Sequence, residues 1–322
     1  LGASSLGANT TGANNVAVGN DALGANTTGA ANVAVGGNAL GTITTTSSNT
    51  AVGFNSLAVS TAANNTAVGR SSLLANTSGT ANVAVGADAL AANTTASSNT
   101  AVGFLAGAAV TTGTNNTLIG ANSGDALTDG IKNVAVGQNA LGADVQGDNS
   151  VAIGINALQA QTGTNGNVYN TAVGANAGFA VTTGTTNTFI GGLAGDAVTT
   201  GSQNTFVGQN SGGATTTAAQ NTAMGEGALA TNTTGASNTA IGRDAMYANT
   251  TGASIVAVGK DALKANTEGH SIVAVGKDAG IANTTGTNNV FMGTDAGNAV
   301  TEGKFNVCIG PADAGENLTT GD

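Results

Sequence analysis

The sequence predicts an all-β fold: a parallel β-solenoid, or β-roll, of about nineteen coils of 17 residues each. Three observations lead to this prediction. An aliphatic residue followed by glycine recurs at a fixed interval, the residues before that glycine alternate as a short strand does, and two further positions exchange side-chain volume. A fixed period in this range indicates stacked units that are each too small to bury a core alone.

The glycine that follows the aliphatic residue marks each repeat. We number every coil from this marker glycine, which is position zero. Sixteen of the eighteen intervals between markers are 17 residues, one is 16 (Gly53 to Gly69) and one is 20 (Gly154 to Gly174). A solenoid grows by length, so we expect residues 1–322 to form a single repetitive domain. Nineteen coils spaced by about 4.8 Å would form a rod of roughly 90 Å. The long interval predicts a local bulge near Asn165 to Tyr169, without a break in the stack.

The composition excludes several classes of protein. The 322 residues include 51 Gly but one Pro, which excludes collagen, and the regularly placed aliphatic residues argue against disorder. The net charge of −10 argues against binding to nucleic acid or to an anionic bilayer. No apolar run approaches the roughly 20 residues of a membrane span. The chain starts with Leu in mid-repeat, so we expect a fragment cut within the repeat array.

A short strand precedes each marker glycine, with the consensus N-[TV]-A-[VI]-G. The residue at position −1 is Val, Ile or Met in all eighteen complete repeats, and we call these residues the aliphatic column. Position −3 is always Thr or Val, and position −2, the mid-strand column, is usually Ala. Positions −1 and −3 share one face of a strand, while position −2 faces the other way. A strand this short cannot stand alone, so it must stack in a ladder.

Polar residues occupy the predicted corners of the coil. Asn fills position −4 in fifteen of eighteen repeats, and a second Asn/Asp column lies at position +2. Both residue types suit corners, and stacked in register they can form amide ladders. Glycines at position zero and near position +10 are expected to supply other tight bends. Thr occurs at position +8 in seventeen of nineteen repeats, which fits either a second short strand or a corner.

Position +4 exchanges volume with the mid-strand column of the next repeat. Where position +4 is Leu or Met, the next mid-strand residue is always Ala; where it is Gly, as at Gly178, the next one is usually large, as at Phe189. Gly124 and Gly212 break this rule. Because cores are packed to nearly constant density, the exchange predicts that the two positions touch inside the coil. We therefore expect Ala152→Phe to recover part of the stability lost in Leu141→Gly.

The opposite face of the strand is also apolar, because it carries the aliphatic column. A solvated strand face would alternate with charged residues, so both faces are expected to be covered. The coil covers one face, and the simplest cover for the other is a second copy of the chain, most simply around a threefold axis. The alternative is a coil wide enough to enclose the aliphatic column, with the mid-strand Ala facing outward.

The repeat resembles two related families. The strings N-T-A-I-G at Asn238–Gly242 and A-N-T-T-G at Ala248–Gly252 resemble the head repeats of trimeric autotransporter adhesins and the repetitive shafts of phage tail-fibre-type proteins. The resemblance covers essentially the whole chain. It implies a left-handed parallel β-roll, three copies about a common axis, and an extracellular location on a virion fibre or a bacterial surface.

The expected function follows from this resemblance. The leading hypothesis is a structural fibre shaft or adhesive rod that presents a host-recognition surface, associates as a homotrimer, and meets a cell-surface glycan or protein receptor. The first alternative is a bacterial surface adhesin head that binds matrix or glycan. A third class is an ice- or calcium-binding solenoid, suggested by the regular Thr column and by an Asp column at position +2.

No residue pattern predicts catalysis, a cofactor or a metal site, so an enzyme is not expected. His270, the single histidine, lies between Gly269 and Ser271, in an expected surface corner. Cys308 is the single cysteine, which excludes an internal disulfide framework, and it occupies the mid-strand column as a small buried residue.

The Asp column offers at most one carboxylate per coil, whereas calcium needs several oxygen ligands per ion. Three of its members directly follow a basic residue, a pattern that predicts surface ion pairs. The basic residues are Arg243, Lys260 and Lys277. The column comprises Asp21, Asp88, Asp244, Asp261, Asp278 and Asp295.

Overall fold

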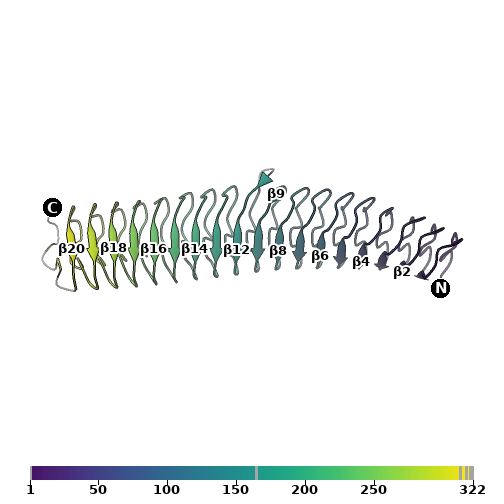
Figure 1. Ribbon diagram of the computed structural model, residues 1–322, viewed down its shortest axis with the longest axis horizontal. Coiled ribbons are helices and arrows are strands. Elements are labelled where there is room, and N and C mark those ends of the chain that lie inside the picture. Colours follow the sequence, from purple (N-terminus) through teal and green to yellow (C-terminus); the bar gives the residue numbers. More distant parts are fainter. Residues whose placement is uncertain (1, 164–165, 312–313, 316–317, 319–322) are drawn as a thin grey trace. The chain divides into compact units, whose positions relative to one another are not determined.

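The computed structural model describes residues 2–163, 166–311, 314–315 and 318. The chain forms two compact units, Leu1–Val168 (unit 1) and Tyr169–Asp322 (unit 2). Within each unit the chain winds into coils that follow one another in sequence order (Figure 1). The described residues contain strands and turns and no helix. The predicted all-β, parallel β-solenoid fold is confirmed.

Each coil of unit 1 contributes one three-residue strand that ends directly before the marker glycine. The strands of successive coils pair in parallel, so that Ala152, for example, lies opposite Ala135. The strands are β1 (Val16–Val18), β2 (Val33–Val35), β3 (Thr50–Val52), β4 (Thr66–Val68), β5 (Val83–Val85), β6 (Thr100–Val102), β7 (Thr117–Ile119), β8 (Val134–Val136) and β10 (Val151–Ile153).

Unit 2 repeats this plan, and its strands are also paired in parallel, each with the strand of the next coil. Equivalent positions stay opposite each other, so each column of the sequence becomes a file of neighbouring side chains. The strands are β12 (Thr171–Val173), β13 (Thr188–Ile190), β14 (Thr205–Val207), β15 (Thr222–Met224), β16 (Thr239–Ile241), β17 (Val256–Val258), β18 (Val273–Val275), β19 (Val290–Met292) and β20 (Val307–Ile309).

The 20-residue interval carries an additional strand pair. β9 (Gly147–Asp148) pairs in parallel with β11 (Gly166–Asn167), away from the main ladder of unit 1. A departure from the regular coil was expected near Asn165 to Tyr169; residue 165 lies outside the described residues, and β11 forms part of that stretch. The extra residues therefore build a local two-stranded ladder.

The mid-strand column points into the coil and the aliphatic column points out. Phe189 is fully buried, whereas its neighbour Ile190 is 41% exposed. Ala34 and Ala135 are fully buried as well. The orientation predicted from the volume exchange is confirmed, and the alternative, in which the coil encloses the aliphatic column, is wrong.

The volume exchange involves two glycines around Leu118 and Phe291, one in the preceding coil and one in the same coil. A Cβ atom placed on Gly280 would lie 2.5 Å from the Phe291 ring, and one on Gly297 would lie 2.2 Å from the same ring. Gly280 belongs to the preceding coil and Gly297 to the coil of Phe291 itself, so the ring needs space in both. The predicted partnership with the preceding coil alone is therefore incomplete.

This geometry explains the two exceptions to the sequence rule. Gly124 makes space for Leu118, whose side chain would lie 2.8 Å from a Cβ at that position. Gly212 does the same for Phe206 at 2.4 Å. In both cases the large residue belongs to the glycine's own coil. These glycines therefore accommodate the large mid-strand residue of their own coil. The mid-strand residue of the next coil can stay small, because the space is already filled.

Amide ladders connect the coils at position −4, as predicted, and at position +7, a column that the sequence patterns did not single out. At the predicted +2 column, Asn38 Nδ2 donates to Asn55 Oδ1 (2.9 Å). At position −4, Asn204 Nδ2 donates to the Ala218 carbonyl (2.9 Å), and Asn204 Oδ1 accepts from the Asn221 backbone N–H (3.0 Å). At position +7, Asn249 Nδ2 donates to Asn232 Oδ1 (2.8 Å), one coil earlier. These amides at positions −4 and +7 are buried, so each of the two ladders satisfies polar backbone groups that water cannot reach.

The turns after the strand use left-handed backbone at positions +2 and +4. Asp244 has φ 55° and Asn139 has φ 55°, as expected for residues that tolerate this conformation. Leu141 at position +4 has φ 52°, although a leucine rarely adopts it. The Thr-rich stretch at position +8 forms a corner and no second strand, so the corner interpretation is the correct one.

Candidate functional surface

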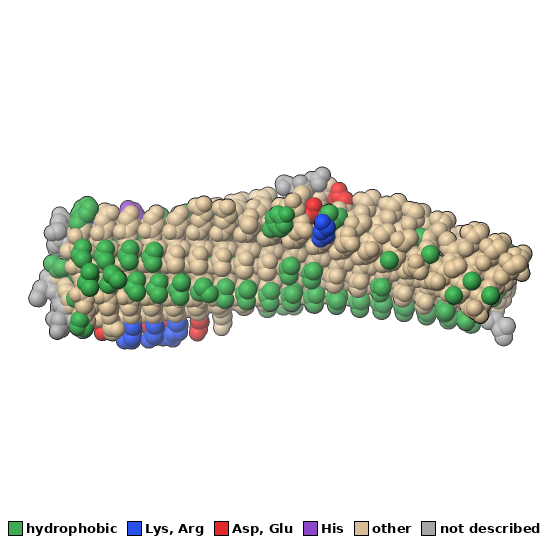
Figure 2. All heavy atoms as spheres, in the orientation of Figure 1, with side chains coloured by type: hydrophobic (Ala, Val, Ile, Leu, Met, Phe, Trp, Pro, Cys, Tyr) green, Lys and Arg blue, Asp and Glu red, His purple; other side chains and the backbone are tan. Residues whose placement is uncertain are grey.

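The aliphatic column forms an exposed apolar file on the outer face of the strand ladder of each unit. In unit 1 it includes Val102 and Ile153, and in unit 2 it includes Ile241 and Met292, all more than a third exposed. Figure 2 shows hydrophobic side chains in rows along the strand faces. Soluble monomers rarely leave a contiguous apolar surface of this extent uncovered, so the file is the main candidate for an interaction surface.

The apolar surface becomes wider toward the end of unit 2. Position −3 is Thr in β12 to β16 and Val in β17 to β20. Val256 and Val273 are 38% and 37% exposed, and they lie beside the aliphatic column on the same strand face. In the last four strands the outer face therefore carries two adjacent apolar files, visible as a double row in Figure 2.

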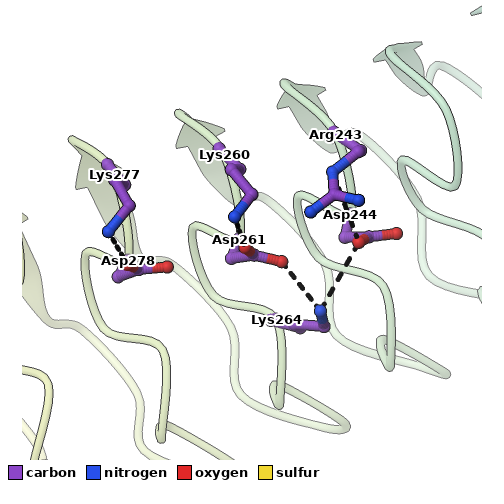
Figure 3. Close-up of polar contacts among 7 residues, drawn as sticks. All are labelled: Arg243, Asp244, Lys260, Asp261, Lys264, Lys277 and Asp278. Atoms are coloured by element: carbon purple, nitrogen blue, oxygen red, sulfur yellow. Dashed lines mark hydrogen bonds and ion pairs between the residues drawn. The ribbon is translucent and has the colours of Figure 1, made fainter.

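A ladder of ion pairs borders this wider stripe. Lys260 Nζ lies 3.0 Å from Asp261 Oδ2, and Lys264 Nζ lies 2.8 Å from Asp261 Oδ1 and 3.4 Å from Asp244 Oδ2 in the preceding coil (Figure 3). Arg243 pairs with Asp244, and Lys277 with Asp278. The predicted surface pairs are therefore present. The sequence pattern did not indicate Lys264, which connects two coils.

The ladder shifts the pKa values of Asp261, Lys264 and Lys277 toward their charged forms. Burial alone would raise the pKa of Asp261, but hydrogen bonds and charge interactions with Lys264 and Lys260 hold it below its usual value. The hydrogen bond to Asp261 raises the pKa of Lys264. Both side chains therefore stay ionised across the physiological range.

In unit 1 the same corner of the coil carries exposed aromatic rings. Phe54 and Phe104 follow a marker glycine directly and are 60% and 53% exposed. The Phe54 ring lies over the preceding coil, because a Cβ on Gly37 would be 3.3 Å from it. Ile155 occupies the equivalent position in a third coil and is also exposed. This corner extends the apolar file of unit 1 around the edge of the strand face.

Most hydroxyl groups of the Thr column donate hydrogen bonds within the protein. Thr199 Oγ1 donates to the Thr216 carbonyl (3.2 Å), and Thr250 Oγ1 donates to the Thr267 carbonyl (3.0 Å). The same bond recurs along most of the column, from each Thr to the next coil. These hydroxyl donors are used within the protein, which weighs against a water-ordering array at this position.

The remaining predicted residues lie apart from one another. His270 is exposed in a corner, and Cys308 is buried in the mid-strand column, where desolvation raises the pKa of its thiol. The Asp column is spread along the corners after the strands. Among the described residues, no group of three or more His, Cys, Asp or Glu side chains is arranged to hold a metal ion.

Asp144 is a buried carboxylate that the sequence patterns did not identify. It accepts hydrogen bonds from the Gly147 backbone N–H (2.9 Å) and from Gln161 Nε2 (2.6 Å), and desolvation raises its pKa. No Lys, Arg or His within the described ranges forms an ion pair with it. Asp144 lies at position +7, which holds Asn in many other coils. That Asn column could have indicated a buried polar position here.

Neither a scan of protein-family models nor a search of curated proteins finds a match to this chain. The part of the chain that the structure describes contains no helix of the length and apolar character needed to cross a membrane.

Proposed function

We propose that this chain is part of an extracellular fibre shaft of the phage tail-fibre type, which holds a host-recognition surface and has no catalytic role. Copies of the chain associate through the outer faces of their strand ladders, as a homotrimer. The observation that carries this proposal is the exposed aliphatic column, which every regular coil contributes in both units. The resemblance of the repeat to fibre shafts supports the choice of a structural function.

Burial of the aliphatic column is large enough to drive assembly. A fully buried Val or Ile side chain stabilises by about 1.5–3 kcal/mol relative to an exposed one. None of the eighteen side chains of the column is fully buried in the single chain, and ten of them are more than a third exposed, so each residue can still gain part of that free energy. Because the ladder of each unit repeats the contact in nine strands, the association is expected to be long-lived.

Light scattering tests the proposal on the purified chain. We expect a monodisperse particle of about three times the chain mass of 30.3 kDa. Val136→Asp in the aliphatic column should disrupt the particle, because it places a charge in the contact. Thr112→Asp is the matched control: this exposed corner position is an Asp in the next coil, Asp129, so the assembly should persist. A wild-type monomer would contradict the trimer.

A surface adhesin head is the second candidate, favoured by the exposed rings of Phe54 and Phe104. Aromatic side chains on a solvent-exposed edge can stack on sugar rings or pack against a protein ligand. We expect, for this function, that the chain binds to a glycan or matrix-protein array and that Phe54→Ala with Phe104→Ala removes the binding. Retention of full binding by the double variant would exclude these rings as the receptor contact.

A further inference from the structure

We propose that the last four strands of unit 2, β17 to β20, form the strongest contact between copies of this chain. This inference rests on the proposed self-association and specifies where along the solenoid it is concentrated. The surface consists of Val256, Val273, Val290 and Val307 at position −3 together with the aliphatic column beside them.

Position −3 changes from Thr in β12 to β16 to Val in β17 to β20. Thr and Val have nearly the same shape, so the strand accepts either one, as the five Thr strands β12 to β16 show. The fold itself therefore does not require Val in β17 to β20. The additional methyl groups nevertheless point outward, where Val256 and Val273 remain more than a third exposed. An uninterrupted outward file of Val is explained by a partner surface that covers it.

The ion-pair ladder also favours a contact between copies at this place. It borders the start of this double apolar stripe, so the region has the apolar centre and polar rim that are typical of protein interfaces. Arg243, Lys260 and Lys277 are each neutralised by the Asp that follows. Copies that approach each other side by side bring identical charges together, and an unpaired file of cations would repel its counterpart. Neutralisation within each chain removes this repulsion.

The spacing of the stripe favours a second copy of the chain over other occupants. Its side chains recur once per coil, at the inter-strand distance of about 4.8 Å. An identical solenoid repeats at the same distance, so each coil can meet an equivalent coil along the whole stripe. With Lys264 the rim carries four cations against three carboxylates, a single excess charge that offers little attraction to a charged ligand. The net charge of −10 disfavours an anionic membrane.

The test compares two sets of isosteric substitutions in the full chain. The first is Val256→Thr with Val273→Thr and Val290→Thr in unit 2. The matched control is Val83→Thr with Val134→Thr and Val151→Thr, which removes the same number of methyl groups at the same position in unit 1. Exchange of subunits between unlabelled and ¹⁵N-labelled particles, followed by native mass spectrometry, measures how firmly copies are held.

We expect the unit 2 substitutions to accelerate subunit exchange by about tenfold or more relative to the control set, because three methyl groups leave the strongest contact. Equal acceleration by the two sets, or no effect of the unit 2 set, would overturn the inference while leaving self-association intact. A wild-type chain that is monomeric in the same spectra would contradict the proposed self-association, and this inference with it.

The rim provides a second, independent variant. Asp261→Asn with Asp278→Asn leaves the strand face unchanged but removes the neutralisation of Lys260 and Lys277. We expect faster subunit exchange at low salt and recovery at high salt, because salt screens the repulsion between copies. An exchange rate that does not depend on these substitutions at any salt concentration would show that the ladder lies outside the contact.

Discussion

Single glycines decide whether successive coils can stack at strand distance. Gly191, a marker glycine, has φ 133°, and a Cβ on it would lie 2.6 Å from the Gly208 carbonyl oxygen of the next coil. Gly29, at position +10, has ordinary backbone, but its Cβ would lie 2.2 Å from the Thr46 carbonyl oxygen. The glycines at position +10 were expected to supply bends; the structure shows that they allow close approach instead.

Substitutions of two adjacent glycines distinguish the need for close stacking of coils from a general loss of backbone flexibility. Gly191→Ala should destabilise unit 2 by at least about 1–3 kcal/mol, because it adds both backbone strain and a clash. Gly192→Ala is the matched control, since its Cβ would meet nothing closer than 4.0 Å; this change should be neutral or stabilise by about 0.4–1 kcal/mol. Chemical denaturation measures both, and a similar loss in the two variants would contradict the stacking argument.

The buried Asp144 should make the stability of unit 1 depend on pH. Desolvation raises its pKa in the folded state, so the folded state binds this proton more tightly than the unfolded state. The carboxylate therefore costs stability above its folded pKa, and stability increases as the pH falls toward the unfolded value of 3.8.

We expect Asp144→Asn to raise the denaturation midpoint at pH 8 and to lose that advantage as the pH falls. An amide suits this position, because Asn occupies the same column in other coils and the Gln161 amide can turn over to accept from it. The control, Glu226→Gln, changes an exposed carboxylate and should leave the midpoint nearly unchanged at every pH. A constant difference between wild type and Asp144→Asn from pH 8 to pH 4 would show that Asp144 does not titrate with folding.

At the scale of the coil, one large side chain fills the space that two neighbouring coils share. The rings of Phe189 and Phe206 stack with their centroids 5.6 Å apart, in successive coils. Gly195, at position +4 between them in sequence, leaves room for Phe189, because a Cβ there would lie 2.5 Å from that ring. The coil interior is therefore packed as a continuous column rather than as separate layers.

The two-glycine arrangement changes what a compensating substitution requires. Leu141→Gly should cost about 2–5 kcal/mol, because it leaves a cavity in the coil. Adding Ala152→Phe alone should recover little, since Leu158 in the same coil still occupies the space of the ring. The triple variant with Leu158→Gly should recover more than the double variant. Chemical denaturation of the series tests this, and a double variant as stable as the triple would show that one glycine is sufficient.

At the scale of the whole molecule, both units use one coil plan with different surfaces. Unit 1 has exposed rings at the corner after the strand, whereas unit 2 has the ion-pair ladder and the double apolar file. The coil interior conserves volume, while the outer positions vary from coil to coil. Variation on the outside of a constant scaffold is what a shaft with several contact regions needs.

The regular repeat predicts the length of the particle. Nineteen coils at about 4.8 Å each give roughly 90 Å. Negative-stain electron micrographs of the purified chain should show particles of about this length, with a width that reflects the number of copies. Compact particles much shorter than this value would contradict the rod.

The coil, its strand and the direction of each strand face were predictable from the repeat alone. These features follow from local alternation and from a period that repeats at every coil, so Ala34, Phe189 and Ile190 could be oriented without coordinates. The amide ladder at position −4 was also predicted, because identical residues one period apart become neighbours in any parallel stack, whereas the ladder at position +7 was not. The expected surface pairs of Lys260 and Lys277 needed only adjacent residues.

The repeat alone did not predict which coils share a side chain or which other polar groups form hydrogen bonds and ion pairs. The second glycine lies in the large residue's own coil, and the bridge from Lys264 to Asp244 joins different columns of neighbouring coils. The buried Asp144 finds its partners in Gly147 of its own coil and Gln161 of the next. A repeat fixes the separation of equivalent positions, but the approach of unlike positions depends on the cross-section of the coil. That cross-section is set by turns such as the left-handed Leu141, for which the residue type carries no signal.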